Sequence, residues 1–193
     1  TDLGASTVSG TLGITSAGAV TDSGTLAVTG ATTISASGQD ITLDQAASTF
    51  GTLLLTGANV AVTDAGATDL GASTVSGTLG ITSAGAVTDS GTLAITGATT
   101  ISASGQDITL DQGASTFGTL SLTGANVAVT DAGATDLGAS TVSGTLGITS
   151  GGVVTDSGIL AITGSTTISA SGQDITLDQA ASTFGTLLLT GAN

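Results

Sequence analysis

The side chains that could carry out chemistry in this 193-residue sequence are those of aspartate, serine and threonine. The chain has no Lys, Arg, His or Cys, and its 14 acidic residues are all Asp. Catalysis needs a nucleophile with a base, a tuned acid–base pair or a metal. Asp40 and Asp44 could form a carboxylate pair, but they are four strand residues apart, a span of ~13 Å, which is too far for glycoside hydrolysis by that pair alone. We therefore expect no enzyme and assign no catalytic or cofactor-binding residue.

Calcium is the metal ion that the aspartates could bind. Carboxylates stacked in neighbouring turns of a chain repel one another, and Ca²⁺ with its oxygen ligands would relieve that repulsion. The candidate ligands lie at or beside Gly-bounded corners and are Asp22, Asp40, Asp44, Asp64 and Asp69. The calcium-binding solenoid nonapeptide G-G-x-G-x-D-x-U-x is absent, and Asp in "TDSG" or "TDAG" is ordinary turn chemistry. A calcium site and solvated turn aspartates both remain open as interpretations.

These residues recur because the whole sequence repeats every 67 residues. The phrase "TDLG" at Thr1 returns at Thr68 and again at Thr135. A fixed period of this kind indicates a repeat architecture. We expect one continuous segment, 1–193, built from the copies 1–67, 68–134 and 135–193, the last of them partial. Because the chain starts and stops within a repeat, we also expect it to be a window from a longer array.

Within each copy, short alternating apolar runs bounded by glycine predict an all-β fold. Runs such as "TLAVT" and "DITLD" have the period of two and the β-branched residues that are typical of strands. The Gly-bounded phrases align in threes, which predicts a parallel β-solenoid with about three short strands per coil and three coils per 67-residue repeat. In this alignment the coils contain ~20, ~27 and ~20 residues, and the phrases at Gly10, Gly30 and Gly57 stack on one another. The alternative is a two-strand coil of ~13 residues.

The copies test which side chains point into the solenoid. A side-chain period of two predicts that Leu53 and Leu55 point inward and that Leu54 points outward. The second copy has Ser at the position of Leu54 and keeps both flanking leucines. Thr25 and Ala19, both predicted to point outward, become Ile and Val in the third copy. The variation therefore occurs where the predicted coil faces solvent.

Composition excludes several classes of partner. With a formal net charge of -14 and no Lys or Arg, the chain cannot neutralise phosphates, so we expect no nucleic-acid partner. The apolar runs are far shorter than the ~18 residues of a membrane span, so we expect no membrane insertion. Phe50, Phe117 and Phe184 occur once per copy and are expected to fill the core at a wide corner.

The phrases "TLAVTG", "DITL" and "TGANVAVTD" make the chain resemble the repeat region of filamentous haemagglutinin-type large bacterial exoproteins. The resemblance covers all 193 residues. It implies a right-handed parallel β-helix, export through an outer-membrane partner, and a role in adhesion or as a surface fibre. The amino-terminal secretion domain of that family has no match in this chain.

These observations favour a structural function. We expect a segment of a long secreted, cell-surface β-solenoid fibre or adhesin stalk, located outside the cell. Each coil buries the apolar face of its neighbour, so the rod can lengthen without a larger core. The expected partner is another copy of the chain, through homotypic stacking or filament formation. The alternative is a binding surface for a host, a matrix glycan or another fibre, with calcium-binding and ice-binding solenoids as further variants.

Overall fold

The structure is a computed structural model that describes residues 1–192, and its elements are all β-strands. Each complete copy contributes nine strands. The first copy forms β1 (Asp2–Leu3), β2 (Ser6–Val8), β3 (Leu12–Thr15), β4 (Val20–Asp22), β5 (Leu26–Val28), β6 (Thr32–Ser35), β7 (Ile41–Leu43), β8 (Thr52–Gly57) and β9 (Val60–Asp64). The second forms β10 (Thr68–Leu70), β11 (Ser73–Val75), β12 (Leu79–Ser83), β13 (Val87–Asp89), β14 (Leu93–Ile95), β15 (Thr99–Ser102), β16 (Ile108–Leu110), β17 (Thr119–Gly124) and β18 (Val127–Asp131). The third forms β19 (Thr135–Leu137), β20 (Ser140–Val142), β21 (Leu146–Ser150), β22 (Val154–Asp156), β23 (Leu160–Ile162), β24 (Ser165–Ser169), β25 (Ile175–Thr176) and β26 (Thr186–Thr190).

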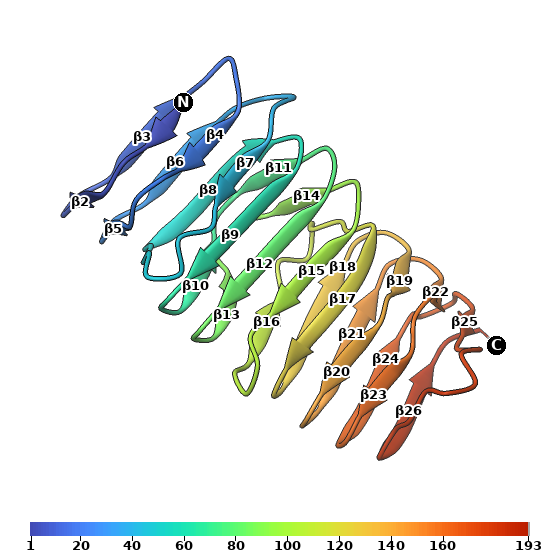
Figure 1. Ribbon diagram of the computed structural model, residues 1–193. Helices are drawn as coiled ribbons and strands as arrows, with labels where there is room; N and C mark the ends of the chain where they lie inside the picture. The colour runs from blue at the N-terminus through green and yellow to red at the C-terminus, as the bar shows by residue number, and fades with distance from the viewer. Residues whose placement is uncertain (193) are drawn as a thin grey trace.

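The strands stack in parallel from one coil to the next, and the two ends of the chain lie at opposite ends of the stack (Figure 1). Two 12-stranded parallel sheets run the length of the molecule, and β2 pairs with β5 in a small third sheet. The central path of each large sheet contains ten strands, which corresponds to about nine turns of the chain. The prediction of a parallel β-solenoid is therefore confirmed.

Each 67-residue copy turns the chain three and a half times. Counted along one sheet, seven steps lead from β3 to β21, which are separated by two copies. The strand at the same position in the intervening copy, β12, lies in the opposite sheet. Equivalent strands of consecutive copies therefore occupy opposite sheets, and the structural period is two sequence copies.

The structure thus has three and a half coils per copy, where the sequence predicted about three. The predicted 27-residue coil does not form. The phrase at Gly30 stacks under the phrase at Gly51 and not under the one at Gly57, because Thr32 pairs with Leu53. Gly57 is the last residue of β8 and is buried there. Its missing Cβ makes room for the Ile41 side chain, 3.0 Å from where that atom would be. Gly57 therefore serves close packing, whereas its spacing in the sequence indicated a corner.

Other glycines do form a corner at which neighbouring coils approach closely, and in the first copy these are Gly10, Gly30 and Gly51. The ideal Cβ of Gly30 would lie 2.6 Å from the carbonyl oxygen of Gly10, and that of Gly51 would lie 2.5 Å from the carbonyl oxygen of Gly30. Any side chain at these positions would meet backbone, which cannot swing away. The same contacts recur in the other copies at Gly97, Gly118, Gly164 and Gly185.

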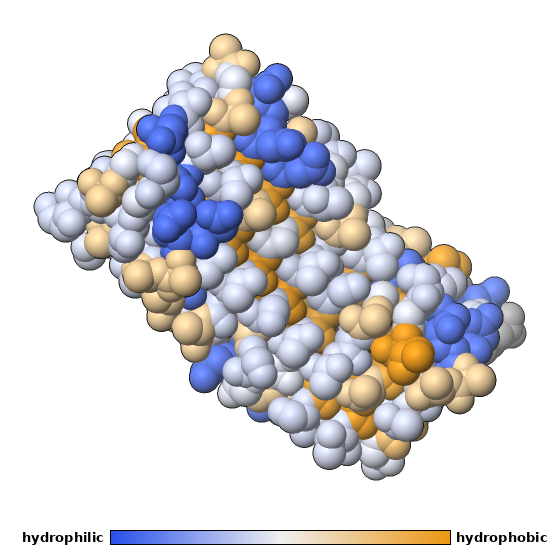
Figure 2. Space-filling view, viewed as in Figure 1, coloured by the Kyte–Doolittle hydropathy of each residue, from blue (hydrophilic) through white to orange (hydrophobic). Residues whose placement is uncertain are grey.

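The core is a narrow column of aliphatic side chains between the sheets. Leu53 and Leu55 are 0% and 1% exposed, while Leu54 between them is partly exposed. Thr25 and Ala19 are exposed, as predicted, so the inward and outward faces inferred from the copies are confirmed. Figure 2 shows one side of the rod as mostly pale, with apolar residues visible in narrow rows along the rod and in a patch toward its C-terminal end.

Phe50 and Phe117 are 7% and 6% exposed and belong to the core, and Phe184 packs against it, as expected. Residues 1–192 contain no helix that is long and apolar enough to cross a membrane.

Candidate functional site

The most buried aspartates, Asp64 and Asp131, each 1% exposed, organise a polar corner inside the solenoid. Asp64 ends β9, and its Oδ1 accepts the Gly66 N–H at 2.8 Å. Its Oδ2 lies 3.2 Å from Thr68 Oγ1, which in turn lies 3.0 Å from Ser83 Oγ in the next coil. Asp131, Gly133, Thr135 and Ser150 form the same arrangement one copy later. The corner therefore ties consecutive coils together by side-chain hydrogen bonds.

Burial raises the pKa of Asp64 and of Asp131 above the ordinary aspartate range, because desolvation penalises the charged form. Hydrogen bonds from Gly66, Thr68 and Phe50 act in the opposite direction on the pKa of Asp64 but do not outweigh the burial. Asp89 also has a raised pKa, first from burial and to a smaller extent from the charge of Asp111. The fold thus holds carboxylates whose proton affinity is higher than in the unfolded chain.

We therefore expect the protein to become more stable on mild acidification. A carboxylate whose folded pKa is raised contributes stability that is fully present below its unfolded pKa, and this is lost as the pH rises through the folded pKa. Lower net charge also reduces self-repulsion. The melting temperature should consequently be higher at about pH 4 than at pH 7, the lower value lying near the reference pKa of Asp.

The Asp64→Asn/Asp131→Asn double variant should show a smaller pH dependence than the wild type. The Asp44→Asn/Asp178→Asn variant is the matched control, because it removes the same charge from exposed positions. A melting temperature that falls between pH 7 and pH 4, or a double variant that keeps the full pH dependence, would contradict this explanation.

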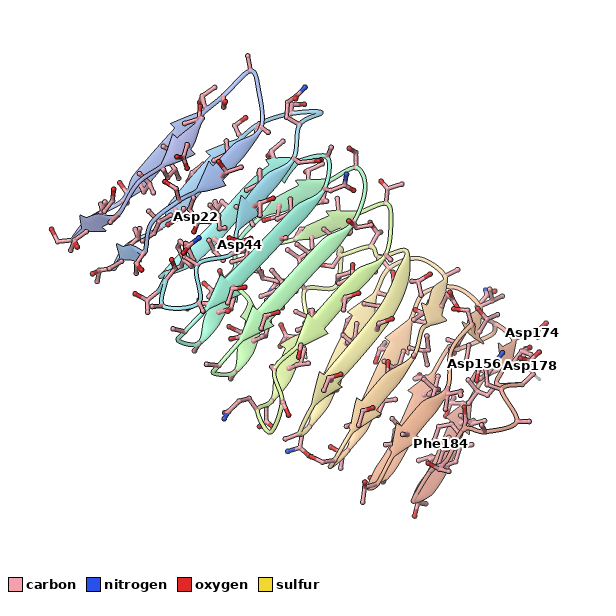
Figure 3. All side chains as sticks on the ribbon, in the orientation of Figure 1. Asp22, Asp44, Asp156, Asp174, Asp178 and Phe184 are labelled. Carbon is pink, nitrogen blue, oxygen red and sulfur yellow. The ribbon has the colours of Figure 1, made fainter. Side chains whose placement is uncertain are left out.

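A second aspartate position shapes the long loop that follows β7. The Asp44 N–H donates to Asp22 Oδ1 at 2.9 Å, and Gln45 Nε2 donates to the Asp22 carbonyl oxygen at 3.2 Å. Asp22 is 6% exposed, and its Oδ2 is buried without a hydrogen-bond partner among the residues described. Asp22 and Asp44 lie close together in Figure 3, as do their equivalents Asp156 and Asp178. In the third copy the Asp178 N–H donates to Asp156 Oδ1 at 2.8 Å. The pair ties the loop after β7 to the preceding coil.

A third position forms a ladder over three coils on the outer edge of the solenoid. Asp40 Oδ1 accepts from the backbone N–H and Nδ2 of Asn59, at 3.1 and 3.0 Å. Asn59 Oδ1 accepts from the N–H and the hydroxyl of Thr78, both at 3.1 Å. The next copy repeats the ladder with Asp107, Asn126 and Thr145.

A fourth position bridges hydroxyls on the surface. Asp69 Oδ2 accepts from Thr52 Oγ1 and from Ser90 Oγ, each at 2.8 Å, and so links the coils on either side. Asp136 does the same with Thr119 and Ser157, at 2.9 and 2.7 Å. At this position too, the carboxylate accepts hydrogen bonds from side chains of the protein itself.

The five calcium candidates are therefore distributed over four separate places. Asp22 and Asp44 lie together, whereas Asp40, Asp64 and Asp69 belong to different networks. In the described part of the chain, no three acidic, His or Cys side chains gather as a metal-binding group. Most of the carboxylate oxygens accept N–H or O–H groups, which is the chemistry of turn and ladder aspartates. Calcium binding at these residues stays a prediction.

The structure also brings together residues that the sequence left scattered. On one sheet, parallel pairing aligns the outward side chains of Thr63, Thr82, Ser102, Thr123 and Thr141. Neighbouring members of this set, the hydroxyl row, are one strand apart, ~4.8 Å. The members of the row are exposed or partly exposed, and no pocket is found in residues 1–192. The row could not be found from the sequence without the register of the coils.

A family model described as repeats of unknown function (DUF5649) matches the chain three times, at residues 1–56, 57–123 and 124–191. No curated protein matches the chain, and no solved structure does. The three matches together span nearly all of the sequence and follow its 67-residue period.

Proposed function

The chain belongs to the family of repeats of unknown function, and we propose that it is a structural segment of a long secreted, cell-surface fibre or adhesin stalk. The observation that carries the proposal is the continuous core. Leu53, Leu120 and their neighbours are buried between successive coils, and the same burial recurs in each nearly identical 67-residue copy, so every added coil covers the one before it. Such a stack extends in one direction at constant cross-section.

The composition supports a place outside the cell. Without Lys or Arg the chain offers no cleavage site to trypsin-like proteases. The absence of Cys removes any thiol that could be oxidised there. The formal charge of -14 also keeps neighbouring rods apart and in solution. The resemblance to filamentous haemagglutinin-type exoproteins favours the same location.

Antibody labelling of the producing cells tests the location. An antibody against the exposed loop around Asp44 should label intact and permeabilised cells equally if the protein lies on the surface. An antibody against a cytoplasmic protein serves as the control and should label only permeabilised cells. Labelling that appears only after permeabilisation would overturn the proposal of a surface fibre.

The hydroxyl row supports a second candidate, a binding surface for a matrix glycan or another fibre. Regularly spaced hydroxyls can donate to and accept from a polymer that has its own repeat. A variant with Val at Thr82 and Thr123 keeps the β-branched shape and removes two hydroxyls from the row. Loss of adhesion in this variant, with its melting temperature unchanged, would favour binding over a purely structural role. Adhesion equal to that of the wild type would exclude the row as the contact.

A further inference from the structure

The exposed aspartates divide each large sheet into charged and uncharged blocks. In the sheet that contains β9, here called the β9 sheet, the strands β9, β12, β15 and β17 form one uncharged block. The outward residues of this block are Ala61, Thr63, Gly80, Thr82, Thr100, Ser102, Thr119, Ser121 and Thr123. A charged block adjoins it on either side in the same sheet, since Asp40 and Asp44 flank β7, and Asp136 points outward from β19.

The opposite sheet, here called the β10 sheet, has the complementary pattern at the same height along the rod. Its strands β10, β13 and β16 alternate along the chain with β9, β12 and β15, and they form a charged block with Asp69, Asp107 and Asp111. One copy later the blocks exchange sides, because each copy turns the chain three and a half times. In Figure 2, hydrophilic residues gather toward both ends of the visible side, with paler residues between them. At each height, therefore, one face of the rod is charged and the opposite face is not.

We propose that copies of this chain associate side by side, with the β9 sheet of one copy against the β10 sheet of the next at the same height. Every uncharged block then faces a charged block of the neighbouring copy. Hydroxyls such as those of Thr82 and Thr100 donate to carboxylates such as those of Asp69 and Asp107 in the neighbour. Two β9 sheets at the same height would instead set carboxylates against carboxylates, which repel one another. The inference rests on the fibre role proposed above and joins such fibres laterally.

The two faces are large enough for a specific contact. About nine turns at a spacing of ~4.8 Å extend over ~43 Å, and the longer strands are ~15 Å across. The contact would therefore cover about 650 Å² on each copy, or about 1,300 Å² in total, which is within the range of specific interfaces. Because two different faces meet, each dimer keeps one free face of each kind, and association continues into a layer of rods.

Net charge makes this contact weak at low ionic strength. Each copy carries a formal charge of -14 and has no Lys, Arg or His to offset it. Pairing charged blocks with uncharged ones keeps the carboxylates of the two copies apart but does not remove the overall repulsion. Salt at ~0.5 M shortens the range of this repulsion to a few ångströms, so we expect association to strengthen with ionic strength.

Two matched variants each block one face. Thr82→Asp/Thr100→Asp adds two charges to the uncharged block of the β9 sheet, and Thr149→Asp/Thr167→Asp adds them at the equivalent positions of the β10 sheet. All four threonines are exposed, so both variants should keep the fold. Every contact of the proposed kind uses both faces, so neither variant should associate with itself. A mixture of the two should form dimers, because the β9 sheet of the second variant and the β10 sheet of the first are unchanged.

Sedimentation velocity over a range of concentrations, in ~0.5 M salt, measures the association. The wild type should form concentration-dependent oligomers larger than a dimer. Each variant alone should dissociate at least tenfold more readily, and the mixture should form dimers but no larger species. Circular dichroism and melting temperature should be the same for the two variants.

Three results would overturn the inference. They are a wild type that stays monomeric at its highest soluble concentration, a variant that associates as well as the wild type, and a mixture that associates no better than either variant alone. These results do not depend on the cell-labelling experiment, so a failure of the lateral contact and a failure of the surface location can be told apart.

Discussion

Replacing Gly97 with alanine is expected to destabilise the protein by about 3 kcal/mol, at the upper end of the usual cost of overpacking. The new Cβ would lie 2.5 Å from the carbonyl oxygen of Gly77 and 2.7 Å from its carbonyl carbon. Both atoms are backbone, so relief requires the two coils to separate at a point where the Gly97 N–H also bonds to that same oxygen at 2.9 Å. Denaturant unfolding of the wild type and the variant measures the difference in free energy.

Gly113→Ala is the matched control for this substitution. No atom lies within 4 Å of the ideal Cβ at Gly113, and the first and third copies already have Ala at this position. Its stability should stay within about 0.5 kcal/mol of the wild type. Equal stability of Gly97→Ala and Gly113→Ala would show that the glycine corners do not approach as closely as the structure has them.

Replacing three buried threonines with valine should, in contrast, increase the free energy of unfolding substantially. Thr32, Thr99 and Thr166 are fully buried at inward positions, and no hydrogen bond to their Oγ1 atoms is formed within residues 1–192. A buried polar group without a partner carries its full desolvation cost, and an apolar group of the same shape removes that cost. We expect the triple valine variant to be more stable by about 1 kcal/mol per site, measured as the change in the unfolding midpoint.

The neighbouring threonines provide the control. Thr33, Thr100 and Thr167 follow directly in sequence but point outward and are exposed. Valine at these three positions leaves the core unchanged, so the stability should change little. If the inward variant were destabilised, the inward hydroxyls would have to be satisfied by bonds that the structure does not contain.

The sequence predicted the solenoid, the strands and the direction of most side chains, because these depend on a period of two that is visible locally. Leu54 and its replacement by Ser in the second copy were sufficient to assign the outward face of β8. The register between coils was only partly predictable, since glycine has more than one role. Gly51 is a corner residue, whereas Gly57 makes room inside a strand for Ile41, and both look alike in the sequence.

The polar networks depend on that register and were therefore beyond sequence reasoning. Asp64 was singled out as a calcium candidate, yet its partner across the corner, Thr68, and the Ser83 hydroxyl of the next coil become its neighbours only when the coils are stacked correctly. Once the coil length is known, the sequence "D-A-G-A-T" followed by a serine one coil later would identify this polar corner. The hydroxyl row was missed for the same reason.

Spin-label distances test most directly the central claim that each copy turns the chain three and a half times. The protein has no cysteine, so pairs of Cys substitutions at the exposed equivalents Thr33, Thr100 and Thr167 label it cleanly. Thr33 and Thr167 lie on one sheet, seven steps of ~4.8 Å apart, so double electron–electron resonance should give a distance of about 34 Å. Thr33 and Thr100 lie on opposite sheets and should be separated by more than their axial offset of about 17 Å. Distances of about 29 Å for the first pair and about 14 Å for the second, as expected for three coils per copy on one face, would contradict the account.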